Sequence, residues 1–368
     1  MINTNNNPFH KRQKQDKIFN SEMKEISLDS PSIKGLISNE KITGALVTKS
    51  ANQWIEEAKK TPIPDMLFDE FWHTGEICIL FSDSNIGKSS LAYQIAESIA
   101  SGKEIEGFKL EAEKQPILYF DFELNKKQVE LRYSVENKTA KVFDNHYLFD
   151  DNFKRVEINS NLDIPDDMSF EEYLNQSIED TINEHYAKVL IIDNITFLIS
   201  EMEKSKGSLP LMRKLKEIKN KYDLSILILA HTPKRDLSQP ITQNQIHGSK
   251  MFFNFADSSF AIGQSSTDKD IRYIKQIKER NKAKKFDAEN VAVCIMEKPY
   301  NFLRFKFLEL GNESEHLKNI SSADKEKLEF DIIELHKTKP ELSQHEIARR
   351  LGTNAMKVNR TLKKQENE

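Results

Sequence analysis

The stretch from Leu80 to Ala92, LFSDSNIGKSSLA, carries the strongest structural signal in this chain. An apolar segment, residues 77–81, leads into a short polar loop, and Gly87-Lys88-Ser89 then opens an amphipathic segment. A strand, a tight loop and a helix start form a cradle for phosphates, because backbone N–H groups and the positive end of the helix dipole face the anion. Lys88 would reach the terminal phosphates of a nucleoside triphosphate, and the Ser89 hydroxyl would hold Mg²⁺.

The loop departs from the pattern Gly-x-x-x-x-Gly-Lys-Ser/Thr at its first glycine, where this chain has Ser82. Asn85 stands where many such loops carry a further glycine, and asparagine tolerates positive φ better than most residues. The carboxylate of Asp83 would repel phosphates unless it points outward. The alternative is a chance Gly-Lys-Ser in an ordinary strand–turn–helix. We expect the nucleotide to contact Ser82, Asp83, Ser84, Asn85, Ile86, Gly87, Lys88, Ser89 and Ser90.

Length and composition limit the class of protein. A chain of 368 residues has room for one large α/β domain and a small one. The net charge of -4 means that any contact with DNA must come from local patches. Cys78 and Cys294 lie in apolar strand-like segments without metal-ligand spacing, which indicates core thiols in a reducing compartment. No apolar run approaches a membrane span and the N-terminus lacks a signal-peptide pattern, so we expect a soluble, cytoplasmic protein.

The order of apolar segments predicts the fold class. Near-continuous apolar strands alternate with helical patterns, which is typical of a parallel sheet covered on both faces. Strands are expected at 77–81, 117–122, 189–192 and 226–230, and helices at 88–101, 126–137, 170–185 and 209–221. After Gly248, antiparallel strands that extend the sheet are expected at 260–263, 272–278, 291–296 and 302–308. The sequence therefore predicts an α/β fold with a mostly parallel sheet, helices on both faces and an antiparallel extension.

The chain divides into four predicted regions. Residues 1–45 are rich in Asn, Lys and Ser without periodicity, which indicates a flexible arm. Trp54, Ile55 and Ala58 suggest a short helix at the start of the P-loop domain, 46–312. Gly311-Asn-Glu-Ser-Glu315 is typical of a linker, assigned to 313–323, and a small all-α module fills 324–368.

Polar residues end three further strands and would complete a site for ATP hydrolysis. Asp193 follows Val189-Leu-Ile-Ile, a Walker B arrangement whose carboxylate helps to hold Mg²⁺ with Ser89. Its spacing from the phosphate loop suits a strand next to the P-loop strand in the sheet. Strand alternation would place Asp121 and Glu123 on one face, with Glu123 nearer the rim, where it would orient and deprotonate the attacking water. His231 ends the fourth strand and would hydrogen-bond the γ-phosphate. The alternatives are a solvated strand end, a helix cap and a structural histidine.

These strand ends, in their order, resemble the RecA-type ATPase core, and within it the RepA/DnaB-like (AAA_25-like) hexameric replicative helicases and the KaiC-like proteins. The resemblance spans roughly residues 68–310. It implies that Glu123 is the catalytic base, Asp193 the Mg²⁺ ligand and His231 the sensor, with ATP and Mg²⁺ as cofactors. The motifs that carry it are Glu76-Ile-Cys-Ile-Leu-Phe81, Tyr119-Phe-Asp-Phe-Glu123, Ile192-Asp193-Asn194, Ala230-His231-Thr232 and His247-Gly248-Ser249.

A further match concerns assembly. Ile277-Lys278-Glu279-Arg280-Asn281 is similar to the Lys-x-Arg-Asn finger of DnaB-like hexamers, although the glycine that often follows is absent. The resemblance implies a homo-oligomer, by analogy a hexamer, in which Lys278 and Arg280 reach the γ-phosphate held by a neighbouring subunit and neutralise developing charge. The alternative is a solvated turn, since a basic run surrounds them: Lys275, Lys282, Lys284 and Lys285.

Two segments predict contact with DNA. The polar loop from Thr232 to His247 corresponds to loops that grip single-stranded DNA in RecA-like proteins, and Lys234 and Arg235 suit phosphate contacts. Residues 343–364 resemble a helix-turn-helix, in which Ile347, Leu351, Val358 and Leu362 pack, Gly352 turns and Asn354 caps the second helix. The alternative is a protein-interaction hairpin. The second helix would present to DNA Lys357, Arg360, Lys363 and Lys364.

The motifs together lead to a ring-forming, ATP-dependent DNA motor or helicase that acts in replication or mobilisation of a mobile element. One alternative is a KaiC- or RadA-like regulatory ATPase that binds DNA without unwinding it. Another is a nucleotide-binding scaffold that has lost turnover, an option raised by Ser82 and Asp83. A small-molecule kinase is less favoured, because no substrate lid is visible.

Overall fold

The structure is a computed structural model that describes residues 41–195, 198, 209–232, 236–245, 250–280, 282–318, 322–351, 353 and 355–366. The described residues divide into two compact units, with the division between Ile63 and Pro64. In the first unit, β1 (Lys41–Thr43) and β2 (Leu46–Thr48) form an antiparallel hairpin. Helix α3 (Ala51–Ala58) follows, and a capping box between Ser50 and Gln53 starts it. The predicted boundary between residues 45 and 46 falls inside this hairpin.

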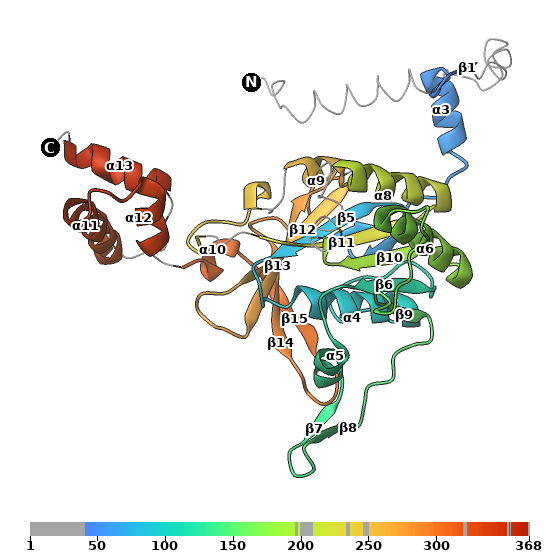
Figure 1. Ribbon diagram of the computed structural model, residues 1–368, viewed down its shortest axis with the longest axis horizontal. Helices are drawn as coiled ribbons and strands as arrows, with labels where there is room; N and C mark the ends of the chain where they lie inside the picture. Colours follow the sequence, from blue (N-terminus) through green and yellow to red (C-terminus); the bar gives the residue numbers. More distant parts are fainter. Residues whose placement is uncertain are drawn as a thin grey trace, which may run out of the picture. The chain divides into compact units, whose positions relative to one another are not determined.

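In the described part of the second unit, nine strands form one sheet, in the order β15-β14-β13-β12-β5-β11-β10-β6-β9 (Figure 1). The parallel strands are β12 (Ser258–Gln264), β5 (Ile77–Ser82), β11 (Ser225–His231), β10 (Val189–Asp193), β6 (Ile117–Asp121) and β9 (Phe153–Val156). The antiparallel ones are β13 (Ile271–Lys278), β14 (Val291–Glu297) and β15 (Arg304–Gly311). The predicted α/β fold with an antiparallel extension is confirmed.

Helices cover both faces of this sheet (Figure 1). Helix α4 (Lys88–Ser101) packs on the face to which β5 contributes Cys78 and Leu80. Helices α6 (Phe170–His185) and α8 (Leu209–Tyr222) pack on the other face, with Ile77, Ile79 and Phe81. Because successive strand side chains point to opposite faces, the apolar run of β5 supplies both cores at once.

The order of the strands brings the predicted site residues together at the carboxyl ends of the parallel strands. We expected the strand of Asp193 beside the P-loop strand, and this is wrong: β11 lies between β5 and β10. Asp193 pairs in register with Asp121, and His231 pairs with Ser82. The carboxyl ends of β5, β11, β10 and β6 therefore meet, at the place where open α/β sheets bind their ligands.

The helix after β6 is shorter than predicted. Helix α5 spans Lys126–Arg132 instead of continuing to residue 137, and β7 (Val135–Asn137) and β8 (Val142–Asp144) form a hairpin after it. The aromatic ring of Tyr133 stacks on Tyr93 and meets Phe149 edge-on. This long-range cluster takes the chain out of the helix. Smaller elements in this unit are β3 (Met66–Phe68), β4 (Trp72–His73), η1 (Gln243–Gln245), α9 (Lys250–Phe255) and α10 (Glu313–His316).

The segment that resembles a linker contains a buried ion pair. Glu313 is 2% exposed, and its carboxylate accepts hydrogen bonds from the Lys275 ammonium and from the backbone N–H of Ile241 at 2.8 Å. Lys275 also donates to the Ile241 carbonyl at 3.0 Å. Lys275 is therefore not part of a solvated basic turn, and the packed fold extends past residue 312. The pair also anchors the loop after β11 at Ile241.

Breaking this pair from one side should destabilise the fold strongly. We expect Lys275→Met to lower the free energy of unfolding by about 3–5 kcal/mol, because Glu313 would keep an uncompensated buried charge. Urea denaturation followed by circular dichroism measures the loss. Lys282→Met is the matched control, because that side chain is 54% exposed and its pair with Glu70, at 3.5 Å, lies at the surface. Equal losses in the two variants would contradict a special role for the buried pair.

The C-terminal residues form a small all-α module with its own core. Its helices are α11 (Ser322–Thr338), α12 (Gln344–Leu351) and α13 (Ala355–Glu366). Of the four residues predicted to pack, Ile347, Val358 and Leu362 lie in the buried core with Ile332 and Ala348, and Leu351 is partly buried against it. Within the described ranges, no helix has the length and apolar character needed to cross a membrane.

Candidate functional site

The loop between β5 and α4 has the backbone of a phosphate-binding loop. Asn85 and Gly87 adopt positive φ angles of 63° and 110°, so asparagine does take the expected turn. Helix α4 starts at Lys88 without a side-chain cap, which leaves its first N–H groups facing the loop, where an anion would bind. A Cβ on Gly87 would lie 2.9 Å from both Met296 and Phe305, so only glycine fits where the loop packs against β14 and β15.

Side chains from other strands hold this loop. Arg272, buried on β13, donates Nε to the carbonyl of Ile86 at 3.0 Å. The buried Ser82 hydroxyl donates to the carbonyl of Asp83 at 2.8 Å. The loop itself therefore supplies a hydrogen-bond partner for the serine that replaces the usual glycine. Thr232, just after β11, donates its hydroxyl to the Asp83 carboxylate. Asp83 is thus tied to the start of the loop that follows His231.

One polar network lies at the carboxyl ends of the parallel strands and consists of Lys88, His231, Glu123 and Asn194. The Lys88 Nζ lies 3.1 Å from Nδ1 of His231. The His231 Nε2 lies 3.5 Å from Oε2 of Glu123, and Asn194 donates to the same oxygen at 2.7 Å. Because an ammonium group only donates, Nδ1 of His231 accepts, and the network assigns the ring proton to Nε2, facing Glu123.

This network sets the charge state of the site. Hydrogen bonds from His231 and then Asn194, working against burial, lower the pKa of Glu123 to about 2. The carboxylate therefore stays ionised, as a general base must be, until the pH falls close to that value. Burial lowers the pKa of Lys88, and the negative charges of Asp193, Glu123 and Asp83 oppose that effect.

Asp193 offers an oxygen that a magnesium ion can bind. The residue is 0% exposed, and its Oδ2 accepts the Tyr119 hydroxyl at 2.7 Å. Its Oδ1 is buried without a hydrogen-bond partner in the described part of the chain. Burial raises the pKa of Asp193 to about 6, and hydrogen bonds from Tyr119 and Ser89 limit the rise. Asp193 and the Ser89 hydroxyl that contacts it offer the oxygen ligands that Mg²⁺ prefers, so these two residues would hold the ion.

The two acids at the end of β6, Asp121 in the strand and Glu123 beyond it, have different environments. The strand ends at Asp121, so alternation does not extend to Glu123, and the prediction that both share a strand face is wrong. Asp121 is buried, and its Oδ1 accepts the backbone N–H groups of Glu123 and Leu124 at 3.2 and 2.9 Å. The side chain of Glu123 is 40% exposed. Neither acid caps α5, because Asn125 does so.

Lys278 and Arg280 lie near the amino ends of the parallel strands, whereas Lys88 lies at their carboxyl ends. Strand β13 is antiparallel to β12, and Lys278 pairs with Ser259 near the start of β12. Both cations donate to backbone carbonyls of residues 253–256, at distances of 2.6 to 2.7 Å. The Arg280 side chain remains 48% exposed. Within one chain these cations are therefore separated from the phosphate loop, and any part in hydrolysis requires a second subunit.

The predicted DNA contacts are described only in part. Lys357 pairs with Glu329 on α11, whereas Arg360 is exposed on α13. Several other predicted residues lie outside the described residues, namely Lys234, Arg235, His247, Gly248, Ser249, Asn281, Gly352 and Asn354, as do the side chains of Lys363 and Lys364.

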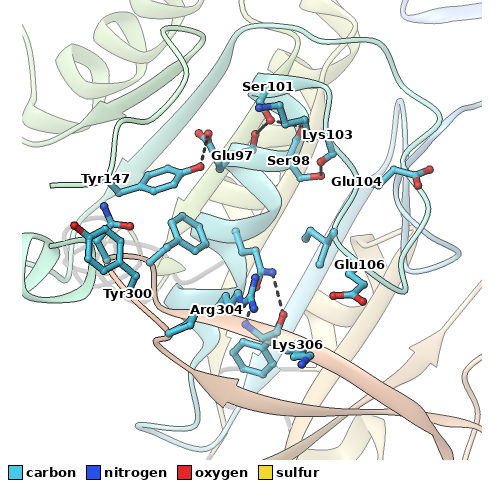
Figure 2. Close-up of a pocket in the computed structure, with 16 residues that line it drawn as sticks. Glu97, Ser98, Ser101, Lys103, Glu104, Glu106, Tyr147, Tyr300, Arg304 and Lys306 are labelled. Atoms are coloured by element: carbon cyan, nitrogen blue, oxygen red, sulfur yellow. Dashed lines mark hydrogen bonds between the residues drawn. The ribbon is translucent and has the colours of Figure 1, made fainter. Parts of the chain in front are cut away.

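A separate cavity of about 390 Å³ lies along the second half of α4 (Figure 2). The Tyr147 hydroxyl donates to Glu97 at 3.1 Å, and burial raises the pKa of Glu97. Tyr300 and Arg304 also line the cavity (Figure 2). Its lining carries both signs of charge and includes no residue of the phosphate loop. We therefore assign the nucleotide to the loop at the start of α4 and not to this cavity.

Four residues that contact the loops or side chains of the site were not predicted as site residues from the sequence: Asn194, Tyr119, Arg272 and Arg155. Asn194 was visible as a polar residue directly after a strand-ending acid, which is a usable signal. Tyr119 and Arg272 lie within strands, and only the register of those strands shows that they face Asp193 and Ile86. Arg155 lies on β9, a strand that was not predicted.

Comparison with known proteins gives one family match. Residues 47–236 match the family AAA_25, described as an AAA domain. No curated protein matches the sequence. Among solved structures, the KaiC-like protein of the hyperthermophilic archaeon Pyrococcus horikoshii OT3 is similar at 13% identity, over 64% of this chain and 90% of that chain, with a TM-score of 0.41.

Proposed function

This chain belongs to the AAA_25 family of AAA domains and is a P-loop ATPase, and we propose that it is a ring-forming, ATP-dependent DNA motor of the RepA/DnaB type. The observation that carries the proposal is the continuous contact from Lys88 through His231 to Glu123. This contact joins Lys88, which would meet the terminal phosphates, to Glu123, which would activate water. His231, in the middle of it, directly precedes the loop proposed to meet DNA.

The chemistry follows from this geometry. Lys88 and the first N–H groups of α4 bind the β- and γ-phosphates. Glu123 accepts a proton from water as the water oxygen bonds to the γ-phosphorus, and the bond from that phosphorus to the bridging oxygen of ADP breaks. Mg²⁺ held by Ser89 and Asp193 would neutralise phosphate charge. Because His231 contacts both Lys88 and Glu123, loss of the γ-phosphate would change its partners and reach Thr232 and the following loop.

Coupling to DNA is supported by the surroundings of that loop. Thr232 is bonded to Asp83 in the phosphate loop, and Ile241 is bonded to the buried Lys275–Glu313 pair. One end of the loop is thus fixed to the nucleotide site and its middle to the rigid sheet. Lys234 and Arg235 lie between these two anchors in the sequence. A change at the phosphates would therefore be passed to Thr232, at the start of the loop proposed to meet DNA, as a motor requires.

The test is hydrolysis and unwinding by the full-length protein. A motor should hydrolyse ATP with Mg²⁺, increase turnover severalfold with single-stranded DNA, and displace a strand from a forked duplex. Hydrolysis without displacement would favour a regulatory ATPase and contradict the motor. Binding of ATP without hydrolysis would favour a scaffold and contradict any enzymatic role.

Arg280 should act across a subunit boundary. We expect Arg280→Ala to lose most turnover, because its charge would stabilise phosphoryl transfer at the neighbouring site. Mixing Arg280→Ala with Lys88→Ala subunits should restore part of the activity, since some interfaces then combine an intact loop with an intact arginine. Lys282→Ala, on the same basic segment, is the control. Normal hydrolysis by Arg280→Ala would show that the finger assignment is wrong.

In the C-terminal module, Arg360 should matter more for DNA than Lys357. Lys357 is already paired with Glu329, whereas Arg360 is exposed on the same helix. We expect Arg360→Ala to weaken duplex binding about five- to tenfold at low salt, and Lys357→Ala to weaken it about twofold or less. Fluorescence anisotropy at two salt concentrations measures both. Equal binding by Arg360→Ala and wild type would favour a protein-interaction module.

A further inference from the structure

A buried carboxylate, that of Asp121, holds the turn that carries Glu123, together with a backbone hydrogen bond from the N–H of Phe122 to the carbonyl of Asp193 at 2.6 Å. The Asp121 side chain is 0% exposed. Its Oδ1 accepts the backbone N–H groups of Glu123 and Leu124, and its Oδ2 accepts the Tyr93 hydroxyl at 3.0 Å. Since the two bonds to Oδ1 come from the backbone of the turn, they fix its path independently of what the Glu123 side chain contacts.

Arg155 closes the other side of this turn. It lies on β9, where it pairs in register with Tyr119, and its side chain is 20% exposed. Its Nε donates to Oδ2 of Asp121 at 2.9 Å, and its Nη2 donates to the carbonyl of Leu124 at 2.6 Å. A guanidinium group presents donors in a rigid fork that can make both contacts at once, whereas a lysine ammonium is a point charge on a flexible stem.

We propose that Arg155 is a positioning residue for ATP hydrolysis, acting on Glu123 through Asp121; this inference rests on the proposed function. The guanidinium balances the buried charge of Asp121 and ties it to Leu124, so the turn presents Glu123 at a fixed place. Activation of water depends on such placement, and a displacement of about 1 Å can cost about a hundredfold in rate. Arg155 itself contacts no residue of the phosphate loop in the described contacts, so nucleotide binding should not depend on it.

Arg155→Lys keeps the positive charge but cannot donate to Asp121 and to the Leu124 carbonyl in the same geometry. We expect kcat for ATP hydrolysis to fall about tenfold to a hundredfold, while KM and the Kd of a fluorescent ATP analogue stay within about twofold of wild type. Lys154→Met, exposed on the same strand, should leave kcat unchanged. Asp121→Asn, nearly isosteric, should show the same loss of kcat with binding retained. The double variant should fall no further than the worse single variant, because the two residues act as a unit.

The outcomes separate this inference from the function on which it rests. Absence of ATP turnover in the wild-type protein would overturn both together. Turnover in wild type, Lys154→Met and Arg155→Lys at equal rates would overturn the role of Arg155 alone. A parallel loss of nucleotide binding and thermal stability in Arg155→Lys and Asp121→Asn would show a purely structural clamp, which also overturns it.

Discussion

Glu123→Gln should stop ATP hydrolysis while leaving ATP bound. Glutamine keeps the size of the side chain and can still accept the hydrogen bond from Asn194, but it cannot take a proton from water. We expect kcat to fall by about 10²–10⁴-fold, the usual contribution of a general base, and Kd for ATP to change little. Steady-state phosphate release and calorimetric titration measure the two quantities.

Glu130→Gln serves as the control for this result. Glu130 lies on α5, close to the same edge, and bonds to Lys127 and His146 without contacting the network. It should retain wild-type turnover. If Glu123→Gln hydrolysed ATP at the wild-type rate, water activation would have to come from another residue, and the role of the His231 contact would have to be reconsidered.

Lys88→Ala should lose both binding and turnover. Lys88 is 5% exposed, and its ammonium points into the polar network, where it would meet the β- and γ-phosphates. Hydrogen bonds to charged groups contribute about 1.5–3 kcal/mol each, so affinity for ATP should fall about tenfold to a hundredfold. Turnover should fall further, because the same charge stabilises phosphoryl transfer. The two effects are measured by titration with a fluorescent analogue and by phosphate release.

Lys126→Ala is the matched control for Lys88→Ala. Lys126 begins α5 at the same edge and is exposed. Loss of binding in both variants would indicate a general effect of positive charge on the nucleotide. Unchanged binding in Lys88→Ala would place the triphosphate elsewhere.

The sequence was informative where function depends on local chain geometry. The residues that form the phosphate loop are consecutive, and Asn85 adopts the positive φ that asparagine tolerates better than most residues. Apolar runs that end in polar residues predicted where β6, β10 and β11 stop. The carboxyl ends of parallel strands meet at one edge, so Glu123, Asp193 and His231 were brought together without knowledge of strand order, even though β10 was expected one place too close to β5.

What could not be predicted depends on contacts between distant segments. Lys275 and Glu313 are far apart in the sequence, and each looked like a surface residue until the register of β13 brought them together. Arg155 and Asp121 meet because β9 adds to the edge of β6, and nothing in residues 153–156 marks them as a strand. The early end of α5 follows from aromatic packing of Tyr133 with Tyr93, which periodicity within the helix does not reveal.

The most direct measurement is a crystal structure of Glu123→Gln with ATP and Mg²⁺. We expect the triphosphate to lie against the N–H groups of residues 86–89, with the γ-phosphate between Lys88 and residue 123 and Mg²⁺ on Ser89 and the free oxygen of Asp193. Nucleotide bound away from this loop, or no nucleotide at millimolar ATP, would contradict the assignment of the site.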